Sequence, residues 1–111
     1  MLIEVRTNGR VEDAETLSDH VKTIVQSTLH RFEDRIRRVD VHLSDMVSDK
    51  SGHDNNRCMM EARLEGREPI AVTQQATSIE KAVHDTVHTL KRSIESVLGR
   101  ESSLEQKRDH R

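Results

Sequence analysis

The spacing of the hydrophobic residues changes along this chain in a definite order, and that order most restricts the folds open to it. In four stretches every second residue is apolar, which is typical of strands with one buried face. In two longer stretches the apolar residues recur three and four positions apart, which is typical of amphipathic helices. The strands are expected at residues 2–7, 38–44, 57–65 and 70–74, and the helices at residues 16–34 and 78–98.

This order of elements, β-α-β-β-β-α, predicts an α+β fold. Each strand has a single apolar face, so both helices must pack on the same face of one four-stranded sheet and form a two-layer sandwich. The first two strands are joined through a helix and should therefore be parallel, whereas the later strands should form antiparallel hairpins.

Polar residues and a glycine mark where the elements should end. Residues 45–56 are expected to form a polar loop, and Gly99 is expected to cap the second helix at its C-terminus. Residues 100–111 are almost wholly polar and should form a disordered charged tail. The sequence thus predicts one domain, residues 1–99, which suits a chain of 111 residues.

The overall charge gives no general indication of nucleic-acid binding. The chain has 18 Lys and Arg residues against 20 Asp and Glu residues, and its formal net charge is −2. Any contact with RNA must therefore come from local clusters of Lys and Arg. Phe32 is the only residue among Phe, Trp and Tyr, so the chain cannot build the stacking platforms that single-strand RNA modules use.

The single cysteine and the first residues of the chain limit the chemistry and the compartment. Cys58 stands alone, which excludes an internal disulfide and a Cys-rich metal site. It alternates with Met60 in a strand pattern, so we expect a small buried core residue rather than a nucleophile. The first residues include no apolar stretch long enough for a signal peptide or a membrane span, so a cytoplasmic protein without membrane contact is expected.

The outer face of the second predicted helix is the main candidate for a binding surface. Its basic residues recur three, four and seven positions apart and therefore share one side: Lys81, His84, His88, Lys91 and Arg92. Asp85 and Glu95 interrupt that side. Such a face can hold RNA phosphates, but a solvated helix surface has the same pattern.

A second group of cations surrounds the first predicted helix. Lys22 lies on this helix, well away from Arg31 around its axis. Four arginines crowd the end of the helix and the start of the next strand: Arg31, Arg35, Arg37 and Arg38. These arginines can form a phosphate clamp, or they can be solvated charges that complement the helix dipole. The spacing alone leaves both interpretations open.

Two histidines resemble half of a zinc-protease motif. His84 and His88 are four residues apart on a predicted helix, with Asp85 where that motif has its glutamate. A catalytic zinc needs three protein ligands, and no third ligand is evident. We therefore expect no metal, no other cofactor and no small-molecule substrate, and the hypothesis of a metal-dependent enzyme rests on these two histidines alone.

Three runs of residues resemble a known family. They are residues 31–43 (RFEDRIRRVDVHL), residues 57–64 (RCMMEARL) and residues 90–94 (LKRSI). They are similar to the helix-to-strand passage, the third strand and the last helix of bacterial ribosome hibernation-promoting factors and ribosome-associated translation inhibitors. The resemblance spans residues 1–100 in the order of its elements.

This resemblance implies a ribosome-binding translation inhibitor that acts under stress. Members of the family bind the small ribosomal subunit between head and body, occupy the path of messenger and transfer RNA, and contact ribosomal RNA through Lys and Arg on both helices. By the match of motifs, Arg92 is the leading contact, with Arg31 and Lys91 on suitable faces. The alternative is a family-like fold without ribosome affinity that serves as a protein-interaction module.

Overall fold

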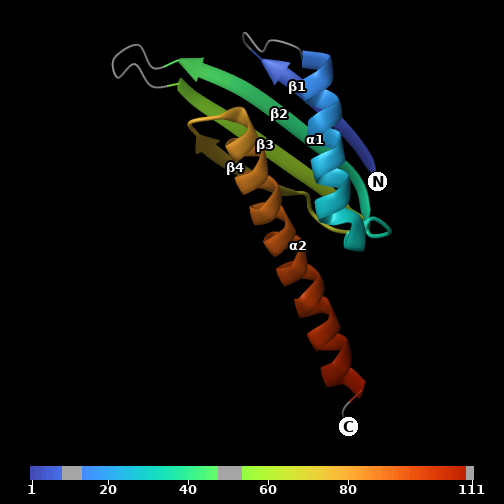
Figure 1. Ribbon diagram of the computed structural model, residues 1–111. Helices are drawn as coiled ribbons and strands as arrows, with labels where there is room; N and C mark the ends of the chain where they lie inside the picture. Colours follow the sequence, from blue (N-terminus) through green and yellow to red (C-terminus); the bar gives the residue numbers. More distant parts are fainter. Residues whose placement is uncertain (9–13, 48–53, 110–111) are drawn as a thin grey trace.

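The elements follow the order that the hydrophobic spacing predicts. The computed structural model describes residues 1–8, 14–47 and 54–109, and its strands and helices alternate as β-α-β-β-β-α (Figure 1). The elements are β1 (Leu2–Asn8), α1 (Ala14–Leu29), a 3₁₀ turn η1 (His30–Phe32), β2 (Ile36–Val47), β3 (Asp54–Leu64), β4 (Ile70–Ala76) and α2 (Ile79–Asp109).

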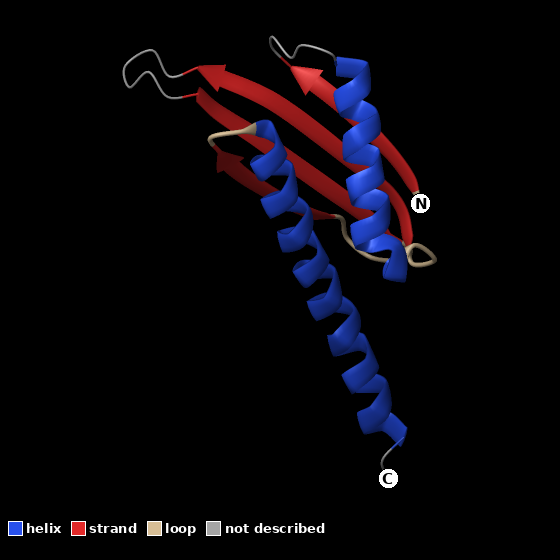
Figure 2. Ribbon diagram, in the orientation of Figure 1, coloured by secondary structure: helices blue, strands red, loops and turns tan. Residues whose placement is uncertain are grey.

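The predicted α+β sandwich is confirmed. Within the described residues the sheet has four strands in the order β1-β2-β3-β4. Strands β1 and β2 are parallel, and the pairs β2–β3 and β3–β4 are antiparallel, as predicted. Both helices lie on one face of the sheet, and the described elements leave the other face uncovered (Figure 2).

The core lies between the sheet and the helices and uses the apolar faces that the sequence predicts. Its fully enclosed side chains come from β2, β3, α1 and α2, and several are less than 2 % exposed: Leu29, Leu43, Met60, Leu90 and Ile94. Thr86 is also buried, although it is polar, because it occupies a position between Val83 and Leu90 on the inner face of α2. The inward-facing residues of the strands and the apolar stripes of the helices therefore form one core layer.

An irregular step near the start of β2 decides which side chains reach the uncovered face. Ile36 pairs with Leu64, but the next paired residue on β2 is Arg38, so Arg37 is an extra residue in the ladder. This bulge allows Ile36 and Val39 to be buried together although they are three residues apart. Between Arg38 and Ser44, every second side chain of β2 points away from the helices, because Val39, Val41 and Leu43 are buried on the helix side.

Several element boundaries differ from the prediction. The first helix was expected to run to residue 34, but α1 ends at Leu29 and the 3₁₀ turn η1 follows. Residues 45–47 and 54–56, expected in a loop, extend β2 and β3, because backbone groups pair there whatever the side chains are. The rest of the expected loop, residues 48–53, lies outside the described residues.

The second helix is longer than predicted and does not end at Gly99. It continues to Asp109 through residues expected in a disordered tail, and it projects past the sheet (Figure 1). The prediction that Gly99 is a C-terminal cap is wrong, because such a cap needs a positive φ and the described glycine with one is Gly66, at 72° in the β3–β4 turn. The Cα extents, 61 × 28 × 19 Å, reflect this elongated shape. The domain boundary at residue 99 stays a prediction.

Candidate nucleic-acid interface

The cations of α2 lie on the outer side of the helix, as their spacing predicts. Lys81, His84 and Arg92 are exposed, and His88 and Lys91 are half-buried. The core residues Leu90 and Ile94 occupy the opposite side and fix the rotation of the helix about its axis. This part of α2 therefore presents its basic groups to solvent.

Arg92 is held toward the β4 side of α2. Its Nη2 lies 3.4 Å from the hydroxyl oxygen of Thr89, and the side-chain amide of Gln74 on β4 donates to the same hydroxyl over 3.3 Å. Neither contact neutralises the guanidinium, so Arg92 keeps its positive charge available to an anion. The rings of His84 and His88 lie beside each other, with centroids 4.4 Å apart.

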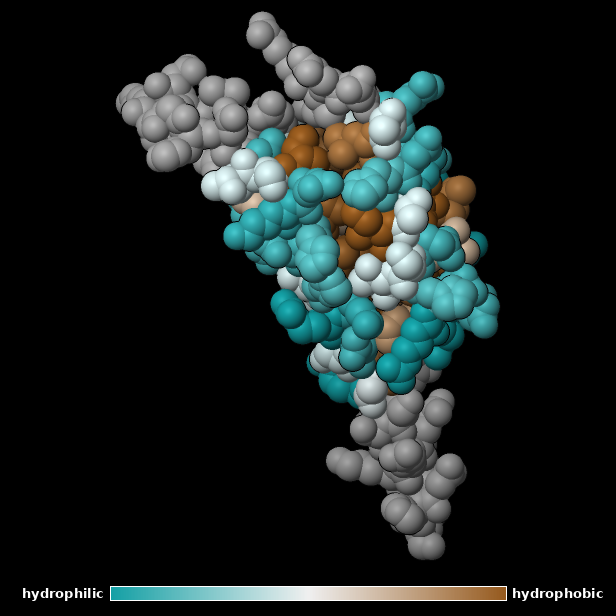
Figure 3. Space-filling view, viewed as in Figure 1, coloured by the Kyte–Doolittle hydropathy of each residue, from teal (hydrophilic) through white to brown (hydrophobic). Residues whose placement is uncertain are grey.

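Acidic residues interleave with these cations. Glu80 is exposed and lies 3.5 Å from His20 on α1, an interhelical contact that sequence reasoning missed. Asp85 is half-buried and Glu95 is exposed on the same helix. Apolar surface gathers between the two helices, with hydrophilic side chains on either side of it (Figure 3).

The cations of α1 and η1 are separate from one another. Lys22 is exposed near the middle of α1, whereas Arg31 is exposed in η1, where its guanidinium carbon lies 5.5 Å from the centroid of the Phe32 ring. No described carboxylate pairs with Arg31. The nearby Glu33 instead accepts a hydrogen bond from Gln26 and lies 3.5 Å from His30.

The arginine cluster that follows α1 does not gather on one surface. Arg35 and Arg37 are exposed, but Arg38 points to the uncovered face of the sheet. There its Nε donates to both carboxylate oxygens of Asp40, at 2.9 and 3.0 Å, and its Nη2 donates to Glu4 over 2.7 Å. The hydrogen bond to Asp40 is the main reason why the pKa of Arg38 is raised. Arg38 is therefore the least available of the predicted RNA contacts.

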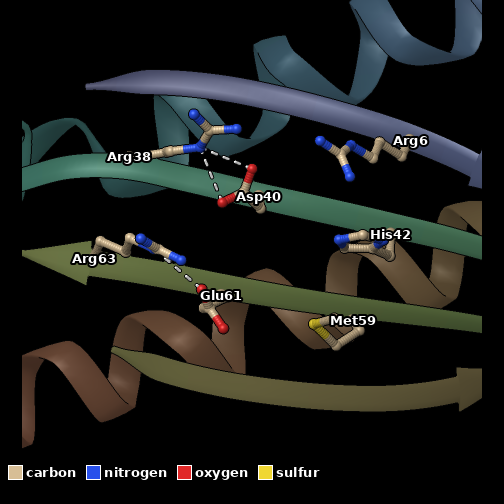
Figure 4. A pocket seen from close by; sticks show the side chains of 7 residues that line it. All are labelled: Arg6, Arg38, Asp40, His42, Met59, Glu61 and Arg63. Carbon is tan, nitrogen blue, oxygen red and sulfur yellow. Dashed lines mark hydrogen bonds and ion pairs between the residues drawn. The ribbon is translucent and has the colours of Figure 1, made fainter. Parts of the chain in front are cut away.

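The uncovered sheet face carries a shallow pocket of about 420 Å³ that the sequence analysis did not anticipate (Figure 4). Two of its arginines are paired with acids, since Arg63 donates to Glu61 over 3.2 Å just as Arg38 donates to Asp40. Arg6 and His42 lie at the other end of the pocket. The signal was present in the sequence, because these residues occupy the outward positions of alternating strands.

A family model described as sigma 54 modulation protein / S30EA ribosomal protein matches residues 12–101, which is most of the chain. This protein belongs to that family. A search of curated protein sequences finds no match for it.

Solved structures give this S30EA family member the same fold. A ribosomal subunit interface protein from Coxiella burnetii superposes with a TM-score of 0.66 at 17 % identity, covering 89 % of this chain and 99 % of the other. The N-terminal domain of Thermus thermophilus Protein Y superposes with a TM-score of 0.65 at 15 % identity, covering 87 % and 99 %. At these identities the likeness establishes the arrangement of strands and helices.

The remaining chemistry-bearing side chains of this family member are core residues or surface groups. Cys58 is fully buried, as predicted, and burial raises the pKa of its thiol to about 11. Among the residues that the structure describes, no three His, Cys, Asp or Glu side chains gather as a metal site would require. No helix in the described ranges is long and apolar enough to cross a membrane.

Proposed function

We propose that this protein is a non-catalytic translation inhibitor that binds the small ribosomal subunit through the basic outer faces of α1 and α2. The observation that carries the proposal is the match of the S30EA family model to residues 12–101. The fold it shares with a ribosomal subunit interface protein and with the Protein Y domain supports the same role. A ribosome-bound role also implies a cytosolic location.

In the proposed mechanism, the protein occupies its site on the ribosome by binding phosphates of the ribosomal RNA. Phe32 is half-buried and lies against Arg31, so the chain has no free aromatic platform for a base. Affinity must therefore come from Lys and Arg on phosphates, each contact releasing counterions. Arg92 and Lys81 are exposed on one side of α2 and are the leading contacts, followed by Lys91 on the same helix and Arg31 in η1. The inhibition then needs no chemical step.

The first prediction concerns salt and charge reversal. Binding to purified small subunits should weaken with salt with a slope of roughly −3 to −4, as expected for three or four phosphate contacts. Arg92→Glu should weaken binding more than Arg92→Ala, because it adds repulsion to the loss of a donor. Cosedimentation over a series of salt concentrations measures both effects.

The control for this experiment is Arg111→Glu, the same change of charge at the far end of the sequence. It should bind as the parent does, and circular dichroism should show every variant folded, since Arg92 lies opposite the core residues Leu90 and Ile94. Equal sedimentation of the Arg92 variants and the parent would contradict the proposal. A protein-interaction module would then be the better explanation, and the acids interleaved on α2 would suit it.

A further inference from the structure

The uncovered face of the sheet is divided into two halves of different charge. In the half nearer the β3–β4 turn, Arg38 and Arg63 flank a row of carboxylates that are opposite one another across the strands: Glu4, Asp40 and Glu61. All three carboxylates are engaged by these two arginines. With two guanidinium groups for three carboxylates, these groups together carry a formal charge of −1.

The half nearer the β2–β3 connection has cations without such partners. Arg6 faces His42 across β1 and β2, and Arg57 lies one outward position further along β3, opposite Ser44. Arg6 and Arg57 are both exposed, and no carboxylate among the described side chains pairs with either. We call Arg6, His42 and Arg57 the open-face patch.

Uncharged hydrogen-bonding groups surround the open-face patch. Thr73 and Gln75 on β4 pair with Met59 and Arg57 and are exposed on the same face. Met59, half-buried, separates Thr73 from His42 in one row. The patch thus combines guanidinium, imidazole, hydroxyl and amide donors, and among the described side chains it has no large exposed apolar anchor.

We propose that the open-face patch binds the phosphodiester backbone of an RNA strand, as a second RNA site on the side opposite the helices. Guanidinium groups match phosphate oxygens in geometry and charge. Arg6 and Arg57 stem from positions two strands and one outward step apart, about 12 Å, so they reach separate phosphates. A protein partner would need apolar or aromatic anchors at the centre of its interface, and the patch offers only Met59.

The site is independent of the helix faces and stands or falls separately from the proposed function. Arg6 and His42 point away from α1 and α2 (Figure 4), and Arg57 is opposite Ser44 on the same face, so an RNA strand held there does not compete for Lys81 or Arg92. Two contacts of this kind add about 1.8 to the magnitude of the salt slope for a duplex.

The test measures binding of a fluorescently labelled RNA hairpin by anisotropy at several salt concentrations. We expect Arg6→Gln/Arg57→Gln to bind roughly tenfold more weakly, with a salt slope smaller by about 1.8. The matched control is Arg67→Gln/Arg100→Gln, which removes the same charge at two exposed positions, one in the β3–β4 turn and one on α2 after Gly99, and should bind nearly as the parent does. Equal losses in the two double variants would overturn the proposal, because the effect would then be one of net charge.

A second readout locates the RNA directly. Met59 and Met60 are neighbours in sequence, but Met59 lies on the uncovered face and Met60 is buried on the helix side. In the full chain labelled on methionine methyl groups, the hairpin should shift the Met59 resonance and leave Met60 unchanged. An unmoved Met59 at saturating hairpin refutes the site.

The outcomes separate this inference from the proposed function. If Arg92→Glu sediments with small subunits as the parent does while the Arg6/Arg57 double variant loses the hairpin, the helix-face proposal fails and the open-face site stands. If the double variant keeps the hairpin and Arg92→Glu loses the subunits, only the open-face site fails.

Discussion

At the scale of single residues, the buried hydroxyl of Thr86 has hydrogen-bonding partners close to it. The Thr86 hydroxyl lies 2.6 Å from the carbonyl oxygen of Ala82, one turn earlier, and 3.3 Å from that of Cys58 on β3. The thiol of Cys58 is buried beside this hydroxyl, and burial raises its pKa more than the hydrogen bond with Thr86 lowers it. The neutral thiol is therefore the form that the folded protein holds.

The second prediction follows for Cys58. At pH 8 a disulfide reagent should fail to label the native protein and should label it at once in denaturant, because the thiolate is the nucleophile and the thiol is buried. Since the pKa of the folded state, about 11, exceeds the value of 9.0 for an exposed thiol, the stability it contributes is complete below pH 9 and falls as the pH rises toward 11. Rapid labelling of native protein would contradict this.

Charge balance on the open sheet face depends on one arginine more than on its neighbours. Arg38 reaches Glu4 and Asp40 together, whereas like charges directly opposite on adjacent strands are destabilising. The third prediction is that Arg38→Ala lowers the melting temperature and that the loss shrinks in high salt. Arg57→Ala, on the same face without a described acidic partner, is the control and should melt as the parent does. Equal melting temperatures of the two variants would show that Arg38 is not needed to offset the repulsion between the carboxylates.

At the scale of the elements, the spacing of apolar residues predicted the buried faces of the helices and strands well but their ends poorly. The stripe of α2 from Val83 to Ile94 is buried as its spacing indicates, because packing requires it. The helix end was misplaced because Gly99 can be helical as well as left-handed, and a single glycine costs a helix only about 1 kcal/mol. The ends of β2 and β3 were missed because their side chains are polar and do not alternate with apolar residues, although the backbones of the two strands pair there.

The fourth prediction compares the two described glycines. Gly99→Ala should stabilise the protein by about 0.5–1 kcal/mol, since it is helical and exposed and a Cβ there meets nothing within 4 Å. Gly66→Ala should destabilise it by about 1 kcal/mol, because φ is +72° at that position. Urea denaturation measures both free energies of unfolding. A loss of stability in Gly99→Ala would contradict a helical Gly99 and favour the C-terminal cap that the sequence predicted.

The same distinction explains which site residues could be found from sequence. Lys81 and Arg92 share a helix face that spacing alone identifies. The pairing of Arg38 with Glu4 joins positions 34 residues apart, so it depends on the parallel register of β1 and β2 and has no local signal. Arg6 and Arg57 were missed because alternation marks them only as outward, and their position relative to each other depends on the order and register of β1, β2 and β3, which have no local signal.

At the scale of the whole molecule, the far end of α2 lies apart from the core. The radius of gyration is 16.2 Å, against about 13 Å for a compact chain of this length, and α2 projects beyond the sheet. Among the side chains that the structure describes, Leu98 is the last along the chain that packs against the core. This is the basis for keeping a domain boundary near residue 99.

The fifth prediction tests that boundary. Deletion of residues 101–111 should leave the melting temperature within about 2 °C of the parent, because a loss of 1 kcal/mol would already shift it by several degrees. Calorimetry of the shortened and full chains gives the comparison. A larger loss would mean that the removed residues contribute to the stability of the domain.

Strand β4 borders the sheet, beside β3 alone, and its seven residues, Ile-Ala-Val-Thr-Gln-Gln-Ala, include no charge. Soluble proteins usually protect such a border with lysine, proline or a bulge, because its outer amides and carbonyls are a template for another chain. Here Pro69, just before the strand, protects one end only. At high protein concentration, association between molecules is therefore expected to begin at the outer edge of β4. Replacing Thr73, which is exposed, with lysine is the simplest change that would make the protein more resistant to aggregation.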